Sequence, residues 1–126
     1  MKIRSVFPML AALVLCAAQV LAAEADHAKK DKEVTVRGEI LDLGCYVSRG
    51  AKGSEHATCA AKCLKGGQPM GLLAEDGTVY LLLADHQDGK PYEAAKELGG
   101  KKVELVGEAA SQGSLKGIAV RSVKAM

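Results

Sequence analysis

The sequence predicts a small, mainly β domain: a five-stranded antiparallel barrel that carries two short helices. Three observations lead to this fold class. Five segments have the apolar pattern of short strands, clusters of glycine and polar residues separate them, and two of the intervening segments have helical signals instead. The chain of 126 residues is long enough for one domain with a modest core.

The first 23 residues have the pattern of a secretory signal peptide. Lys2 and Arg4 form a positive start, an apolar run extends over residues 6–20, and small residues follow at positions 22 and 23. This run is short for a membrane span, so we expect a periplasmic or secreted protein with no membrane association after signal removal. Residues 24–33 are charged and alanine-rich, which predicts a mobile leader before a folded domain at residues 34–126.

Charge and aromatic content argue against nucleic acid as a partner. The chain has 17 basic and 15 acidic residues, and the signal peptide takes Lys2 and Arg4 with it, which leaves a formally neutral protein. Only Tyr46, Tyr80 and Tyr92 supply aromatic rings beyond the signal peptide. Nucleic-acid-binding domains usually present a basic surface and aromatic side chains on which bases stack, so we expect no nucleic-acid partner.

The first strand is expected at residues 34–43, because Val34, Val36 and Ile40 alternate with polar residues. Gly38 marks a bend or bulge in it. The other strands are expected at residues 70–74, 78–84, 102–108 and 115–123, with hairpin turns at 75–77 and 111–114. Residues 79–83 are apolar without alternation, which predicts that the third strand is the most deeply buried.

Two segments have helical signals. In residues 54–64, Ser54 can cap the N-terminus, and Gly66 with Gly67 can end the helix. Residues 92–98 form the second expected helix, which Gly99 and Gly100 close. The first helix is thus inserted between strands 1 and 2, and the second lies between strands 3 and 4. A five-stranded chain with a helix between its third and fourth strands has the order of the OB-fold.

The chemistry of the chain concentrates at residues 45–67, where Cys45, His56, Cys59 and Cys63 follow a C-x10-H-x2-C-x3-C pattern. On a helix, the last three would share one face, because they are spaced i, i+3, i+7. Cys45 is expected to reach that face from a glycine-containing loop. Three thiolates and an imidazole make a known zinc shell, and thiolates also favour Cu(I). We therefore predict a zinc or copper ion on these four residues, for structure or metal handling and without catalysis.

Other interpretations of the cysteines stay open. A disulfide from Cys45 to Cys59 or Cys63 would staple the inserted helix, and the barrel would then be a binding module for a protein or small ligand. A thiol redox protein is a third interpretation, although C-x3-C differs from the C-x2-C of thioredoxin-like enzymes. Covalent haem attachment needs C-x2-C-H, which the sequence lacks.

Three other residues could take part in metal binding, but an ordinary structural role is expected for each. Asp42 could support His56 from the end of the first strand, but we expect an exposed carboxylate there. Met70 could be a soft neighbour of the metal, and core packing is the preferred interpretation. His86 falls between Asp85 and Asp88 in a polar segment, which favours a solvated loop.

The cysteine segment, with Gly66, Gly67 and Pro69 after it, resembles that of small, secreted, largely uncharacterised bacterial proteins of the OB-fold type, which share a Cys…His-x2-Cys-x3-Cys segment. The segments at 98–108 and 116–123 are similar to the closing hairpin of bacterial OB-fold proteins. This resemblance covers residues 34–123 and implies the fold and a periplasmic or secreted location. It implies no activity, and a periplasmic protein partner is compatible with it.

Overall fold

The computed structural model describes residues 32–126, so the expected signal peptide and all but the last two residues of the expected leader lie outside the described residues. The strands are β1 (Lys32–Asp42), β2 (Met70–Ala74), β3 (Val79–Ala84), β4 (Lys102–Gln112) and β5 (Leu115–Ala125). The α-helices are α1 (Leu43–Arg49), α2 (Ala57–Lys65) and α3 (Lys90–Ala95), and single 3-10 turns lie at Ser54–His56 and Lys96–Leu98.

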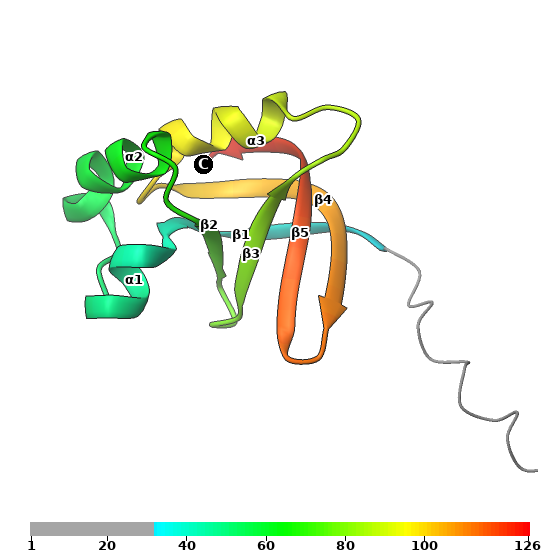
Figure 1. The fold of residues 1–126 in the computed structure, drawn as a ribbon, viewed down its shortest axis with the longest axis horizontal. Coiled ribbons are helices and arrows are strands. Elements are labelled where there is room, and N and C mark those ends of the chain that lie inside the picture. Colours follow the sequence, from blue (N-terminus) through cyan, green and yellow to red (C-terminus); the bar gives the residue numbers. More distant parts are fainter. Residues whose placement is uncertain (1–31) are drawn as a thin grey trace, which may run out of the picture.

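The five strands close into a barrel in the order β1-β2-β3-β5-β4, which confirms the predicted barrel of the OB-fold type (Figure 1). β1 pairs with both β2 and β4 in antiparallel fashion. β3 pairs with β5 in parallel, so the expectation of a wholly antiparallel barrel was wrong for this pair. The expected second helix corresponds to α3 and the 3-10 turn after it, and α3 packs against β3 and β5.

All five strands contribute to the core. Ile40, Leu72, Leu82, Leu105 and Ile118, one from each strand, are at most 2% exposed. Met70 is fully buried in the same cluster, which confirms the core-packing interpretation of that residue. Leu64 of α2 and Ala95 of α3 are also fully buried there, so both helices are fixed to the barrel by apolar contact.

Gly38 lies where β1 is hydrogen-bonded on both sides, opposite Ala74 of β2 and Val103 of β4. A Cβ atom at this position would come within 2.3 Å of the backbone oxygen of Leu73. The glycine therefore permits a close approach of strands. The register shift of the sheet, expected at Gly38, lies instead between Val106 and Gly107 in the pairing of β4 with β5.

The expectation that the third strand is the most buried was wrong. In β3 only Leu82 is buried, and Leu83 is 46% exposed. Four of the five residues of β2 are buried. The reason is that Leu43 of α1 covers the outer face of β2, where its side chain contacts Gly71, while β3 keeps one open face.

Several boundaries also differ from the expected ones. β1 begins at Lys32, two residues inside the expected leader, and pairs there with Ala109 of β4. The segment around Cys45, expected as a loop, is the helix α1. None of the helices within residues 32–126 is long and apolar enough to cross a membrane.

Candidate metal centre

The four predicted ligands lie on the segment between β1 and β2. Cys45 belongs to α1, His56 ends the first 3-10 turn, and Cys59 and Cys63 lie on α2. Figure 1 shows α1 and α2 together on one side of the barrel. Asp42 caps α1 by accepting hydrogen bonds from the backbone N–H groups of Gly44 and Cys45, at 2.9 and 3.3 Å.

The helix α1 places Cys45 close to Cys59 and Cys63 of α2. Gly50 ends α1 with a positive φ of 68°, and its backbone N–H donates to the carbonyls of Cys45 and Tyr46. Cys45 therefore lies on a short capped helix and not on the glycine-containing loop that the sequence predicted. The position of Cys45 is therefore set by regular backbone hydrogen bonds and by the cap from Asp42.

The three thiols converge. The Sγ atoms of Cys45, Cys59 and Cys63 all lie within 4.8 Å of one another, and all three cysteines are free. Cys59 is exposed, whereas Cys45 and Cys63 are half-buried, so solvent reaches the cluster from the side of Cys59. Three sulfur atoms at this separation can hold one thiophilic metal ion after a small adjustment of side chains.

His56 belongs to a second group of potential metal ligands, together with Cys45 and Asp42. One nitrogen of His56, the Cys45 Sγ and one Asp42 oxygen also lie within 4.8 Å of one another. Cys45 therefore belongs to both groups, and it connects the predicted imidazole ligand to the three thiols.

Asp42 is 1% exposed, so the expectation of an exposed carboxylate at the strand end was wrong. The helices that follow the strand fold back over this residue. Burial by itself raises the pKa of Asp42, but the nearby Cys45 thiol, the Cys45 backbone N–H, the nearby Cys63 thiol and the Gly44 backbone N–H together outweigh it and hold the pKa below its ordinary value. The carboxylate is therefore negatively charged beside the thiols.

Two buried polar atoms of the centre lack hydrogen-bond partners among the described residues. They are Oδ2 of Asp42 and Nε2 of His56. Leaving such a group unsatisfied away from water costs about 1–3 kcal/mol, and more for a charged group. Native proteins rarely leave such groups without a partner, and a bound cation would supply one.

Arg49 also belongs to the centre, and sequence reasoning missed it. Its Nη2 donates to the Cys45 Sγ over 3.0 Å, and this hydrogen bond raises the pKa of the guanidinium. The signal was present as the i, i+4 spacing of Cys45 and Arg49, but it is informative only once the segment is known to be helical.

The thiol of Cys63 is in a different electrostatic environment. Burial, followed by the neighbouring Cys59 thiol and the Asp42 carboxylate, raises the pKa of Cys63 to about 11. Without a metal this thiol is protonated at neutral pH. A metal cation at the cluster would reverse this preference, because coordination deprotonates a thiol.

His86 lies apart from this centre, in the exposed segment between β3 and α3, as expected of a solvated loop. Comparisons of the sequence with protein-family models, with curated proteins and with solved structures each find no match. The site geometry is therefore the basis of the functional argument.

Proposed function

We propose that this is a periplasmic or secreted protein that binds a transition metal ion, zinc or copper, through Cys45, His56, Cys59 and Cys63, without catalysis of its own. The observation that carries the proposal is the convergence of three free thiols from two helices. In an oxidising compartment an odd number of neighbouring thiols needs a protecting partner, and a metal ion supplies one.

The electrostatics support a cation at this place. Three thiolates together with Asp42 would bring four negative charges to one small volume, against the single positive charge of Arg49. Like charges at this separation repel strongly, which is one reason that Cys63 holds its proton in the metal-free protein. A divalent ion, or Cu(I), would neutralise much of this charge and allow the thiols to ionise.

Exposure of Cys59 supports metal handling over a purely structural ion. A partner that donates or accepts the metal can reach a cluster in which one ligand is exposed to solvent. Zinc fits the full set of three thiolates and the imidazole. Cu(I) fits the three thiolates alone, with His56 left beside Asp42.

The raised pKa of Cys63 argues against a redox role for this thiol. A thiol that attacks disulfides needs a depressed pKa, and burial raises the pKa of Cys63 to about 11. Thiol exchange at this residue would therefore be slow at neutral pH.

A metal titration of the reduced protein tests the proposal. Zinc or Cu(I) should raise the midpoint of thermal unfolding, and a chelator should reverse this, because metal binds the folded chain. His56→Ala should weaken zinc binding, whereas His86→Ala, a matched change of an exposed histidine, should leave it unchanged. Destabilisation by reductant, with no response to metal or chelator, would reject the proposal and support a disulfide staple.

A further inference from the structure

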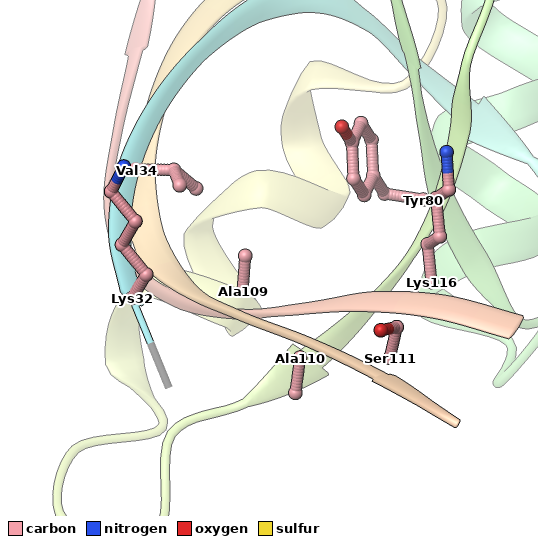
Figure 2. A pocket seen from close by; sticks show the side chains of 7 residues that line it. All are labelled: Lys32, Val34, Tyr80, Ala109, Ala110, Ser111 and Lys116. Atoms are coloured by element: carbon pink, nitrogen blue, oxygen red, sulfur yellow. The ribbon is translucent and has the colours of Figure 1, made fainter. Parts of the chain in front are cut away.

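A second candidate site lies in a part of the barrel that shares no residue with the metal centre. A cavity of about 250 Å³ opens between β1, β3, β4 and β5. It is lined by Lys32, Val34, Tyr80, Ala109, Ala110, Ser111 and Lys116, none of which belongs to the metal centre (Figure 2).

The inner part of the cavity is apolar. Val34, Tyr80 and Ala109 pack against the buried core but stay partly exposed. Figure 2 shows Val34 and the ring of Tyr80 facing each other across the opening, with Ala109 between them. The cavity thus exposes a portion of the barrel's apolar interior, which is the surface that an aromatic ring or short aliphatic group would cover.

The rim is positively charged. Lys32 and Lys116 stand on opposite sides of the opening, and Ser111 and Tyr80 add hydroxyl groups (Figure 2). No carboxylate is among the lining residues described for this cavity. Two acidic side chains lie near the rim. Glu33 accepts from Arg121 at 3.2 Å. Asp76 accepts from the backbone N–H of Thr78, and this hydrogen bond, aided by the charge of Lys116, lowers the pKa of Asp76. An anionic group entering the opening would therefore meet two ammonium groups and no lining carboxylate.

We propose that this cavity binds a small organic anion: a carboxylate or sulfonate carried on an aromatic or short aliphatic body. The apolar body would lie against Val34, Tyr80 and Ala109, and the acidic group would lie between Lys32 and Lys116. The volume is slightly below the range of about 300–1,000 Å³ typical of pockets for drug-sized ligands, which restricts the ligand to a smaller molecule. This site is independent of the proposed metal function.

Naphthalene-2-carboxylate and its neutral isostere naphthalene-2-carboxamide are suitable probes. Titration of the isotope-labelled protein with each, followed by two-dimensional NMR, measures affinity and location together. The carboxylate should bind saturably with a dissociation constant of about 1 mM, as expected for a ligand of this size. It should shift the resonances of Val34 and Ala109, and the carboxamide should bind at least about threefold more weakly because it lacks the charge.

Variants separate the charged rim from the apolar floor. Lys32→Gln with Lys116→Gln should weaken binding of the carboxylate by about tenfold and leave the carboxamide unchanged. Lys90→Gln with Lys124→Gln, a matched loss of two exposed lysines elsewhere, should change neither. Ala109→Leu, which fills the floor, should weaken both probes, and circular dichroism checks that each variant is folded.

Three results would overturn the proposal: no saturable binding of the carboxylate, equal affinity for the carboxamide, or an affinity unchanged by the double Lys→Gln variant. Because metal loading is measured separately, failure here would leave the metal proposal untouched.

Discussion

Asp42, at the end of β1, belongs both to the cap of α1 and to the candidate metal centre. Its Oδ1 caps α1, and its Oδ2 is buried with no hydrogen bond among the described residues. One of the two oxygens lies within 4.8 Å of the Cys45 Sγ and of a nitrogen of His56. A carboxylate beside a metal-bound histidine or thiolate orients the ligand and adds negative charge to the site. We therefore regard Asp42 as a positioning residue of the proposed metal centre.

Asp42→Asn separates these two roles, because the amide oxygen can still cap α1 while the charge is lost. We expect the metal affinity to fall by about 10- to 100-fold, as for other residues that support metal ligands. Competition with a chromophoric chelator measures this, and Asp88→Asn, in the exposed segment before α3, is the matched control. An affinity equal to that of the unmodified protein would show that Asp42 acts only as a cap.

Among the secondary-structure elements, the strands were predictable and α1 was not. Alternating apolar residues report directly which face of a strand is buried, so the strands were located within a few residues. α1 is only seven residues long and contains Gly44 and Val47, which are weak helix formers. Its N-terminal cap, Asp42, is a local signal that the sequence does contain, but the contact of Leu43 with Gly71 of β2 is tertiary, and a short window of sequence does not contain it.

The same dependence on tertiary contacts explains the candidate site. Helical spacing predicted that His56, Cys59 and Cys63 share one face near Cys45. The structure groups Cys59 and Cys63 with Cys45, and it groups His56 with Cys45 and Asp42. The burial of Asp42 could not be predicted, because it arises when α1 and α2 fold back over the strand end. The grouping of His56 with Asp42 instead of with all three thiols depends likewise on backbone geometry.

A substitution at Gly38 tests how closely β2 approaches β1. Gly38→Ala would place a methyl group 2.3 Å from the Leu73 backbone oxygen, and the paired strands leave little room to move. We expect a loss of about 1–3 kcal/mol in the free energy of unfolding, the usual cost of overpacking. Urea denaturation measures it. Gly89→Ala is the control, because the new methyl group would lie 3.9 Å from the Cβ atom of Ala84. Equal stabilities of the two variants would mean that the strands separate easily.

For the molecule as a whole, Arg121 connects distant parts of the barrel surface. Its guanidinium forms ion pairs with Glu33 of β1, Asp85 after β3 and Glu108 of β4. The backbone N–H of Gln87, aided by Arg121, lowers the pKa of Asp85 below its usual value. These interactions are partly exposed, so each contributes modestly and is weakened by salt.

The lowered pKa of Asp85 predicts an acid-sensitive contribution to stability. The folded protein binds this proton less tightly than the unfolded chain does, so the contribution is present above the ordinary pKa of 3.8 and is lost as the pH falls through the lower folded value. Arg121→Gln should therefore reduce the free energy of unfolding at pH 7 and should reduce it less at pH 2.5. A pH-independent difference between the two proteins would contradict this assignment.

The most direct test of the metal centre is the intact mass of the protein after expression into a bacterial periplasm, measured in native and denatured form. Thiol alkylation follows unfolding, without reductant. We predict a native mass that includes zinc or copper, lost on denaturation, together with alkylation of Cys45, Cys59 and Cys63. A metal-free native mass with only one alkylated cysteine would contradict the proposal, because two of the three sulfurs would then form a disulfide.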